Sequence, residues 1–402
     1  MPISKRSWIL CAAMVATIPG NASAGVVNNV LTQWRAHAEK CQDPRQGDAD
    51  AMVNVAMFEA INAVTPKYTP YTKMIEAPEG SSPEAAAARA AHDVLVLVCA
   101  DQKAMFDDAL KASLEAVTDK AARDNGEKVG MEAAAAVIAA RANSKAEGKD
   151  PVNRPQTPGA YVQTTPYYGT ISGKQQPWIM AKPDEMRPAP PVALDSAAWA
   201  RDFNEVKTMG AKGANGRTAE QTDIGKFWAG RSVAIVLNQF IGRPGRSLVD
   251  DARFLALAEM AWADSYVAMM DGKYHYNFWR PVTAIRNADM DGNDATAPDT
   301  QWEPMVTNTP GHPEYPCGHC LSAGAVGAVI AQEFGSDAPP IVLEAEDALL
   351  RRYDTPQEYI DDVTISRIYA GVHYRFSAEA GRDAGVAIGN VAAKRYFLPL
   401  GK

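Results

Sequence analysis

Runs with helical periodicity cover most of this chain, and they constrain its fold more than any other feature. In these runs, which are rich in Ala and Glu, apolar residues recur three and four positions apart. The runs cover 49–63, 83–116, 119–147, 196–210, 218–242, 247–271, 319–334 and 356–395. Almost no stretch has the strict alternation of a half-buried strand, and we find no internal repeat. The sequence therefore predicts an all-α protein built as a helical bundle.

The segment 148–191 differs in composition from the helical runs. It contains nine prolines and several aromatic residues, including Tyr161 and Trp178. A connection of this length is unusual inside a compact domain. We expect it to lie over the bundle and to form a wall at the entrance of a site. Together with this irregular segment, residues 25–402 are expected to form a single domain.

Residues 1–24 have the composition of a signal peptide. Lys5 and Arg6 precede an apolar run, and a small-residue cleavage site ends at Ala24. The apolar run is too short to span a membrane, so we expect a periplasmic or secreted protein without membrane insertion. Loss of the peptide removes Lys5 and Arg6 and takes the formal charge from −8 to −10. Such an acidic chain is not expected to bind nucleic acid or anionic lipid.

Four cysteines remain after cleavage, and an oxidising compartment allows them to form disulfides. Cys41 can pair with Cys99, and Cys317 with Cys320, although the sequence does not fix the connectivity. The sequence also leaves the oligomeric state open, with a homodimer among the alternatives.

Four of the six histidines lie between positions 273 and 373, inside three short cationic motifs. The motifs occupy 273–281, 310–320 and 366–376. One lysine, two arginines and several imidazoles that converge would form a site for a tetrahedral oxyanion. Guanidinium groups match its oxygens bidentately, and an ammonium group adds a point charge. An imidazole can then bind the central atom or exchange protons near neutral pH.

The spacing inside two of the motifs bears on this convergence. Lys273 and Arg280 are seven residues apart, so they share a face if the helix continues up to the Arg-Pro stop. Arg367 and His373 are six residues apart and do not share a helix face. Either Gly371 loosens the turn between them or the pocket wraps around that helix, and the sequence leaves both open.

Two further features lie near the motifs. The turn at Gly318 opens an apolar helical run, whose first backbone N–H groups are donors for an anion. Asp264 and Asp271 precede Lys273 on one run. They either brace the cationic side chains or lie on an exposed helix face.

Together the motifs resemble a known signature. Lys-x6-Arg-Pro, then Pro-x-Gly-His, then Ser-Arg-x5-His is similar to the pattern of the type-2 phosphatidic acid phosphatase superfamily. The upstream segments 49–71, 187–210 and 217–228 resemble bacterial vanadium-dependent haloperoxidases. The resemblance implies two four-helix bundles that share one core, of the type found in these haloperoxidases and the related acid phosphatases.

The resemblance also implies a role for each motif residue. His373 is the axial ligand of a vanadate cofactor, or the phosphate nucleophile if the protein is a phosphatase. His319 is the acid/base. The groups that hold the vanadate oxygens are the side chains of Lys273, Arg280 and Arg367 and the backbone N–H of Gly318.

At two positions this chain departs from the pattern of its implied relatives, and a third position bears on which of those relatives it resembles. Cys317 replaces a serine that hydrogen-bonds an oxygen, and a thiol is a poor donor. Ser377 replaces the aspartate that orients the nucleophilic histidine in phosphatases, which weakens the phosphatase interpretation. His312 stands at a position where the resemblance implies a second histidine in bromoperoxidases and an aromatic residue in chloroperoxidases. It favours bromide or iodide as substrate.

The expected function is oxidation of bromide or iodide by hydrogen peroxide to a hypohalous acid, with vanadate as cofactor and a small organic acceptor as a further partner. The alternative is an acid phosphatase with His373 as nucleophile. A remote alternative is a thiol-disulfide oxidoreductase, because Cys317-Gly318-His319-Cys320 is also the redox motif of disulfide isomerases; the βαβ pattern that such a motif needs is missing. A catalytically silent helical protein that binds phosphate is a third hypothesis.

Overall fold

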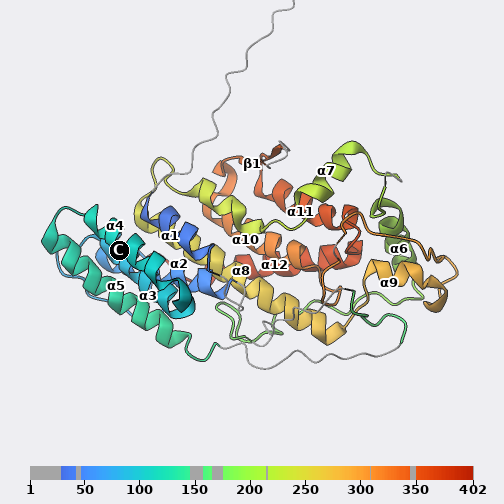
Figure 1. Ribbon diagram of the computed structural model, residues 1–402, viewed down its shortest axis with the longest axis horizontal. Coiled ribbons are helices and arrows are strands. Elements are labelled where there is room, and N and C mark those ends of the chain that lie inside the picture. Colours follow the sequence, from blue (N-terminus) through green and yellow to red (C-terminus); the bar gives the residue numbers. More distant parts are fainter. Residues whose placement is uncertain are drawn as a thin grey trace, which may run out of the picture.

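The computed structural model describes residues 29–41, 47–144, 157–164, 175–213, 216–307, 309–344 and 350–401. The expected signal peptide, 1–24, and parts of the segment 148–191 lie outside these residues. Within them the protein is helical, with one two-stranded hairpin (Figure 1). Among the described helices, none combines the length and the apolar character that a membrane crossing requires.

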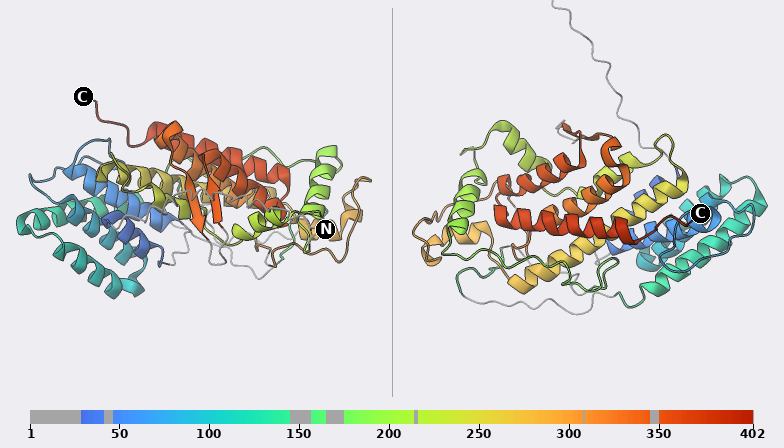
Figure 2. Two further views of the ribbon diagram at one scale, coloured as in Figure 1. Left: turned by 90° about the horizontal axis from the view of Figure 1, so that it is seen from above. Right: turned by 180° about the vertical axis from the view of Figure 1, so that it is seen from behind.

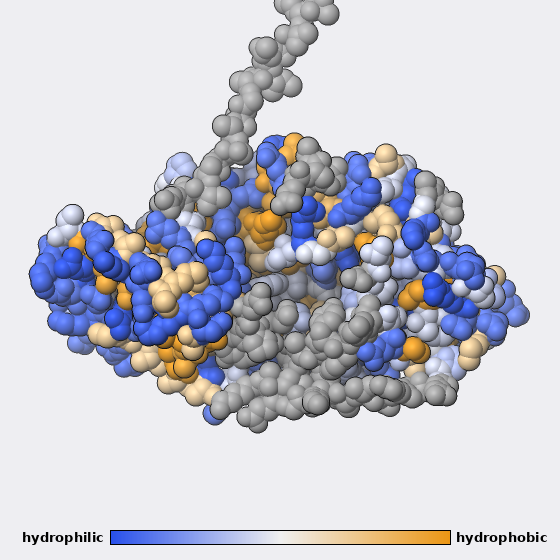
Figure 3. Space-filling model, viewed as in Figure 1, coloured by the Kyte–Doolittle hydropathy of each residue, from blue (hydrophilic) through white to orange (hydrophobic). Residues whose placement is uncertain are grey.

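The N-terminal helices form one end of the molecule (Figure 1). They are α1 (Val30–Ala38), α2 (Asp48–Val64), α3 (Pro83–Val98), α4 (Lys103–Glu115) and α5 (Lys120–Ala140). Helix α3 begins where Ser82 accepts the backbone N–H of Ala85 and Pro83 takes the first helical position. A disulfide between Cys41 and Cys99 joins the ends of α1 and α3. The outer face of this group is largely hydrophilic (Figure 3), as expected for amphipathic helices that turn their apolar side inward.

The C-terminal helices pack around the long helix α8 (Leu248–Tyr276). They are α10 (Gly318–Phe334), α11 (Pro356–Tyr369) and α12 (Arg375–Arg395). Helix α8 also packs against α2, so it connects the two groups (Figures 1 and 2). One hydrophobic core extends from Leu31 in α1 through Leu257 in α8 to Ile388 in α12. This agrees with the shared core that the resemblance implied.

Shorter elements surround the second group. Helices α6 (Ala197–Met209), α7 (Ala219–Phe227) and α9 (Pro281–Arg286) lie at the end of the molecule opposite to α3–α5 (Figure 1). The 3-10 segments are η1 (Ala100–Gln102), η3 (Val233–Phe240), η4 (Ala288–Met290) and η5 (Gly335–Asp337). Strands β1 (Ile341–Glu344) and β2 (Leu350–Tyr353) pair antiparallel, with Ile341 opposite Tyr353. This hairpin lies beside η3 and α11 (Figure 2).

Helices α10 and α12 approach each other closely because glycines line their contact. A Cβ at Gly385 would lie 1.9 Å from the carbonyl oxygen of Leu321, and one at Gly324 would lie 2.4 Å from that of Arg382. Two main chains come this near only where side chains are missing. The contact therefore fixes the position of α10, whose first residues carry part of the second cationic motif.

Most of the predicted helical runs are observed, but three of them break. The run 83–116 divides at Cys99 into α3, η1 and α4, and the run 218–242 divides into α7 and η3. The run 356–395 divides where Gly371 takes a left-handed φ of 78°. The hairpin was not predicted. Its strands have only four residues each, which is too short for an alternating pattern to stand out.

Candidate active site

The second and third cationic motifs line a cavity of about 810 Å³ beside α8, and Arg280 of the first motif contacts His312 and His373 in its wall. The cavity wall is formed by the start of α10, the end of α11, residues 305–307, Pro310 and His312, and the segment 229–233 at the start of η3. On the α8 side the wall consists of Trp262, Tyr266 and Met269. Of the residues that the sequence analysis singled out, those that line the cavity are His312, Gly318, His319, Arg367 and His373.

Helix α8 ends inside the first motif, before it reaches Arg280. Helix α8 ends at Tyr276, because Asn277 adopts a left-handed conformation with φ 48° and caps the helix. Arg280 is the N-cap residue of the next helix, with Pro281 in the first helical position. Lys273 and Arg280 therefore converge through a turn between two helices, and the prediction that they share one helix face is wrong.

The guanidinium group of Arg280 holds two histidines in place. Its Nη2 lies 2.9 Å from Nδ1 of His312, and its Nη1 lies 3.3 Å from Nε2 of His373. It also donates to the carbonyl oxygens of His312 and Val372, at 3.0 and 2.9 Å. Arg280 is fully buried, and its donors tie the second motif to the third. Burial and the nearby charge of Lys273 hold the pKa of His312 well below its ordinary value.

Lys273 is fully buried in the last turn of α8. Its ammonium group donates to three carbonyl oxygens of the following loop, those of Pro313, Glu314 and Pro316, at 2.9, 2.8 and 2.7 Å. All three N–H bonds are thus used inside the protein. Burial, followed by the charge of Arg280, holds the pKa of Lys273 well below its ordinary value. Lys273 therefore fixes the loop 313–316. Toward a bound anion it offers its charge, and it can donate a hydrogen bond to that anion only by giving up one of the three carbonyl oxygens.

Arg367 reaches the cavity from the last turn of α11. Its Nη1 donates to the carbonyl oxygen of Trp228 at 3.1 Å, while its buried Nε has no hydrogen-bond partner within the described part of the chain. Burial and the charge of Arg280 lower its pKa to about 10. After α11 the chain turns at Gly371, so His373 faces the same cavity from outside the helix. Of the two arrangements that the sequence left open, the structure has the one in which Gly371 changes the turn between Arg367 and His373.

His373 is paired with a carboxylate that the sequence analysis did not single out. Its Nδ1 lies 2.7 Å from Oε1 of Glu314, and the backbone N–H of Tyr374 donates to that same oxygen at 3.2 Å. Burial raises the pKa of Glu314 to about 7, against the opposing charges of Lys273 and Arg280. Burial, followed by the charge of Arg280, lowers the pKa of His373 well below its usual value. In the sequence, the one sign of this role for Glu314 was its place as an acidic residue between two histidines, His312 and His319, of the same motif.

The start of α10 brings a backbone donor and an imidazole to the cavity. Gly318 is the first residue of α10, where backbone N–H groups lack helical partners. A Cβ at this position would lie 2.2 Å from Sδ of Met269, so glycine fits the wall of the cavity without a shift of that side chain. Burial and the charge of Arg367 lower the pKa of His319 to about 3. His319 is therefore neutral near pH 7, and it is a weak base while the charge of Arg367 is not balanced by an anion.

Cys317 cannot act as a hydrogen-bond donor. It forms a disulfide with Cys320, so the sulfur carries no hydrogen. Its Sγ instead accepts the backbone N–H of Cys320 at 3.3 Å and caps α10. Both sulfurs belong to fully buried residues. The structure contains the two pairings that the sequence left open, Cys41 with Cys99 and Cys317 with Cys320.

Asp264 has neither of the roles that the sequence suggested. It is fully buried and accepts the backbone N–H groups of Trp178, Ile179 and Met180 at 2.6, 2.8 and 2.9 Å. It therefore anchors the described end of the Pro-rich segment on α8, so that this part of the segment lies over the bundle as expected. Asp271 pairs with Arg187, with contacts of 2.7 and 2.9 Å, and so holds the same segment further along.

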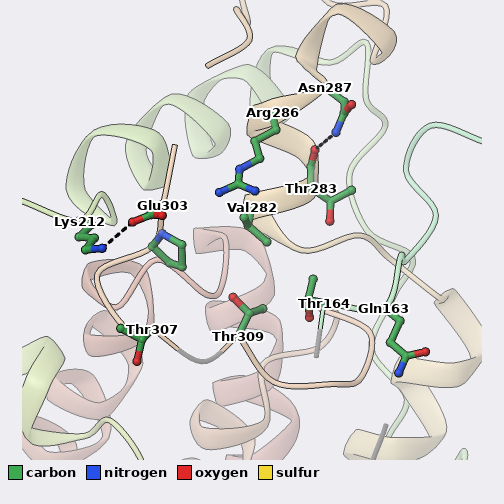
Figure 4. A pocket seen from close by; sticks show the side chains of 11 residues that line it. Gln163, Thr164, Lys212, Val282, Thr283, Arg286, Asn287, Glu303, Thr307 and Thr309 are labelled. Atoms are coloured by element: carbon green, nitrogen blue, oxygen red, sulfur yellow. Dashed lines mark hydrogen bonds and ion pairs between the residues drawn. The ribbon is translucent and has the colours of Figure 1, made fainter. Parts of the chain in front are cut away.

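A second, more polar cavity of about 590 Å³ lies next to the first. Thr307 lines both cavities. Figure 4 shows the ion pair between Lys212 and Glu303 on one side of the second cavity and the guanidinium group of Arg286 on another. Gln163 and Thr164, from the Pro-rich segment, lie on the far side (Figure 4). The prediction that this segment walls the entrance of the candidate site remains a prediction.

The residues around the first cavity fit an oxyanion. The buried side chains of Lys273, Arg280 and Arg367 lie near one another, and Glu314 is the carboxylate that acts on this group, so the number of basic side chains exceeds that of acidic ones even when Glu314 is ionised. Burying cations without matching anions is costly, and a bound anion removes that cost. The unpartnered Nε of Arg367 supplies a donor toward such an anion. Vanadate and phosphate both have the charge and the oxygens that this arrangement requires.

Solved structures define the class of protein to which this fold corresponds. A bacterial vanadium-dependent iodoperoxidase superposes with a TM-score of 0.74 at 22% identity, over 93% of this chain and 96% of that chain. A holo-type bacterial vanadium-dependent chloroperoxidase superposes with a TM-score of 0.69 at 18% identity, over 91% of this chain and 97% of that chain. The chain therefore has the fold of the vanadium-dependent haloperoxidases, as its motifs indicated.

Comparison of sequences also finds relatives, and the family match covers the second group of helices. Residues 253–399 match the family described as the VCPO second helical-bundle domain, and these residues contain all three cationic motifs. The vanadium chloroperoxidase of Curvularia inaequalis is 27% identical over 184 residues, which cover 33% of this chain and 29% of that protein. The match thus spans less than a third of the length of that relative.

Proposed function

We propose that this protein is a vanadate-dependent haloperoxidase that oxidises bromide or iodide with hydrogen peroxide to a hypohalous acid. The observation that carries this proposal is the excess of buried positive charge around His373. The charges of Arg280, Lys273 and Arg367 all act on His373, whose Nδ1 is already engaged, and Arg367 brings an unpartnered Nε to the wall of the same cavity. The fold and the family match of residues 253–399 support the same conclusion.

Under this proposal each residue has a distinct task. Nε2 of His373 would bind the metal. The groups that hold the oxygens of the anion are the side chains of Arg280 and Arg367, the backbone N–H of Gly318 and the charge of Lys273. His319, which is neutral near pH 7, accepts the proton that hydrogen peroxide gives up. Vanadate, when bound, supplies a Lewis-acidic centre that activates peroxide for attack by halide without a redox change at the metal.

The cavity wall supports a preference for bromide or iodide. His312 lines the cavity and contacts Arg280, which in turn contacts His373. A polar ring at this position changes the hydrogen bonding around the bound anion, whereas a phenyl ring would not offer a nitrogen to Arg280. We expect His312→Phe to shift the ratio of kcat/KM for chloride and bromide. Equal ratios in wild type and variant, measured over several pH values, would mean that His312 does not select the halide.

Acid phosphatase is the second candidate, and one observation favours it. The contact between Glu314 and His373 orients the imidazole in the way that a nucleophile requires, although Ser377 replaces the expected aspartate. The thiol-disulfide alternative has less support. Cys317 and Cys320 are fully buried at the start of a helix, where a protein substrate cannot reach them.

One experiment separates the two main candidates. The protein is purified, freed of bound anions, and assayed with and without added orthovanadate. Bromide-dependent halogenation of a phenolic dye is compared with hydrolysis of p-nitrophenyl phosphate. We expect halogenation that requires vanadate, and phosphate hydrolysis that vanadate inhibits by competition. Hydrolysis without any vanadate-dependent halogenation would assign the protein to the phosphatases.

We further propose that residues 1–24 direct the protein to the periplasm or the outside of the cell. The composition of these residues and the disulfides Cys41–Cys99 and Cys317–Cys320 support an oxidising compartment. The apolar wall of Trp262, Tyr266 and Met269 is compatible with a small organic acceptor in the same cavity. Mass analysis of the N-terminus of the exported protein tests the cleavage after Ala24.

A further inference from the structure

We propose that Glu314 is the positioning residue that fixes the tautomer and the ring orientation of His373, and that it acts from the loop before α10. This inference rests on the proposed function, in which Nε2 of His373 binds the anion. Glu314 does not line the cavity wall, so it acts through His373.

The first line of support is the geometry of the carboxylate. Glu314 is fully buried, and its Oε1 lies 2.7 Å from Nδ1 of His373. The same oxygen accepts the backbone N–H of Tyr374 at 3.2 Å. One carboxylate oxygen thus holds the imidazole ring and the main chain that follows it. This fixes both the position of the residue and the rotation of its ring.

The second line of support comes from the opposite edge of the ring. Nε2 of His373 lies 3.3 Å from Nη1 of Arg280, and a guanidinium nitrogen can only donate. Nε2 must therefore be the acceptor, which leaves the hydrogen on Nδ1, where Glu314 accepts it. The other tautomer would set two donors against each other at Arg280 and two lone pairs against each other at Glu314. Two independent contacts therefore select the same tautomer, with the Nε2 lone pair free of hydrogen.

The loop that carries Glu314 is itself held by the cations of the site. Lys273 donates to the carbonyl oxygens of Pro313, Glu314 and Pro316, and Arg280 donates to that of His312. These bonds fix the backbone from which the Glu314 side chain extends toward His373.

A neighbouring position on α12 offers a way to move the carboxylate. The hydroxyl group of Ser377, buried in the first turn of α12, lies beside the carboxyl group of Glu314. The backbone of this turn is tied to the start of α10, since the N–H of Cys317 donates to the carbonyl oxygen of Ser377 at 3.3 Å. An aspartate at position 377 would therefore place a carboxylate in the same buried space, with no change to the loop 312–316.

The test compares Glu314→Ala, Glu314→Gln and the double variant Glu314→Ala with Ser377→Asp. Glu303→Gln serves as control, because Glu303 is an exposed acid that pairs with Lys212 beside the second cavity. Two quantities are measured in each protein: the protonation of the two His373 nitrogens by 15N NMR without added anion, and the dissociation constant of orthovanadate by calorimetric titration.

In the wild type and the control we expect a hydrogen on Nδ1 and none on Nε2 of His373. In Glu314→Ala only the longer contact of 3.3 Å with Arg280 still favours the Nδ1–H tautomer. We therefore expect the other tautomer to appear beside it, and the dissociation constant for vanadate to rise about 10- to 100-fold, the usual effect of losing a carboxylate behind a ligand histidine. Glu314→Gln, which preserves volume and one acceptor, should show a smaller increase. The double variant should recover the Nδ1–H tautomer and most of the affinity.

Two results would overturn the inference. One is a Glu314→Ala protein that keeps the tautomer and binds vanadate within twofold of the wild type. The other is loss of affinity in Glu314→Ala while the tautomer stays fixed, which would mean that Glu314 acts only through charge. If Glu314→Ala does not fold, Glu314→Gln decides by the same two measurements. Failure of the wild type to bind vanadate would reject the proposed function, whereas the NMR comparison would still decide the role of Glu314.

Discussion

At the scale of single residues, the cationic side chains of the site divide into two kinds. Lys273 uses all of its donors on the carbonyl oxygens of its own protein, whereas Arg367 keeps a buried Nε without a partner among the described residues. One therefore supports the loop that holds Glu314, and the other is available for a ligand. The sequence does not distinguish them, because a motif gives the type of a residue and not the partners of its side chain.

The ligand role of His373 predicts a specific loss. His373→Ala removes the nitrogen that would bind the metal, so we expect vanadate-dependent halogenation to disappear even at excess vanadate. His275→Ala is the matched control, since His275 is an exposed histidine at the end of α8 that does not line the cavity. We expect this control to keep activity within twofold. Full activity of His373→Ala in a dye-halogenation assay would contradict the assignment.

The two kinds of cation predict opposite effects on stability. Lys273→Met leaves three buried carbonyl oxygens without donors, so the free energy of unfolding should fall by about 2 kcal/mol. Arg367→Met removes one hydrogen bond, to the carbonyl oxygen of Trp228, together with a buried charge that has no carboxylate partner among the described residues. The relief of that charge offsets the lost bond, so the anion-free protein should be unchanged or slightly more stable. Vanadate affinity should fall in both variants. Denaturant midpoints measured without added anions check the difference, and equal losses in both would contradict it.

At the scale of elements, helix α8 links the Pro-rich segment to the site. Its Asp264 binds three backbone N–H groups of that segment, and its Lys273, in the last turn, binds three carbonyl oxygens of the loop 313–316. One helix therefore sets the relative positions of the Pro-rich segment and the loop 313–316. In their described parts, neither segment has regular secondary structure that would fix its own path.

The burial of Asp264 predicts a pH-dependent contribution to stability. Burial raises its pKa from 3.8 to about 6, against the three backbone N–H groups that favour its charged form. A raised pKa in the folded state adds stability that is fully present below pH 3.8 and is lost as the pH rises to about 6. The stability advantage of the wild type over Asp264→Asn should therefore shrink between about pH 4 and about pH 7. Urea midpoints of both proteins check this, and a constant difference would mean that Asp264 keeps an ordinary pKa.

The glycine contact between α10 and α12 predicts a steric effect on both fold and site. In Gly385→Ala the new methyl group meets the backbone carbonyl of Leu321, which cannot rotate away. The helices must separate, so the free energy of unfolding should fall by about 2–3 kcal/mol. Vanadate affinity should fall as well, because Gly318 moves with α10. Asp383→Ala, on the exposed side of α12, is the control, and an equal melting temperature in both variants would contradict the close contact.

At the scale of the whole molecule, two groups of helices share one core. The site belongs to the second group, while the Cys41–Cys99 disulfide belongs to the first. A change in the first group can therefore reach the site through the common core and α8. This arrangement separates the residues that bind the anion from many of those that stabilise the fold.

The two disulfides predict unequal contributions to stability. Cys41 and Cys99 are 58 residues apart, and Cys317 and Cys320 only three. Because a cross-link restricts the unfolded chain more when its loop is longer, replacing Cys41 and Cys99 by serine should cost about 4 kcal/mol and replacing the other pair about 2 kcal/mol. Denaturant unfolding of both double variants measures the costs. A larger loss for the short loop would show that native packing outweighs chain entropy there.

The sequence by itself determined the helical class of this protein and the identity of its cationic motifs. Helix α3 begins at a Ser-Pro cap and α10 begins near a glycine turn, and both are written in neighbouring residues. Periodicity and capping depend on contacts within about four positions, so a single sequence reveals them. The motifs Lys-x6-Arg-Pro, Pro-x-Gly-His and Ser-Arg-x5-His are likewise local patterns, so the amino-acid sequence is enough to recognise them.

Only the tertiary structure decided which side chains meet. Glu314 and His373 are separated by 59 positions, and nothing in their local patterns shows that they form a pair. By its spacing Asp264 is a candidate for a helix surface, but the Pro-rich segment lies over it, and the early end of α8 at Asn277 sets the course of Arg280. Such contacts depend on the path of the whole chain and on the cost of burying unpaired charge. These are properties of the packed molecule and not of any short stretch of its sequence.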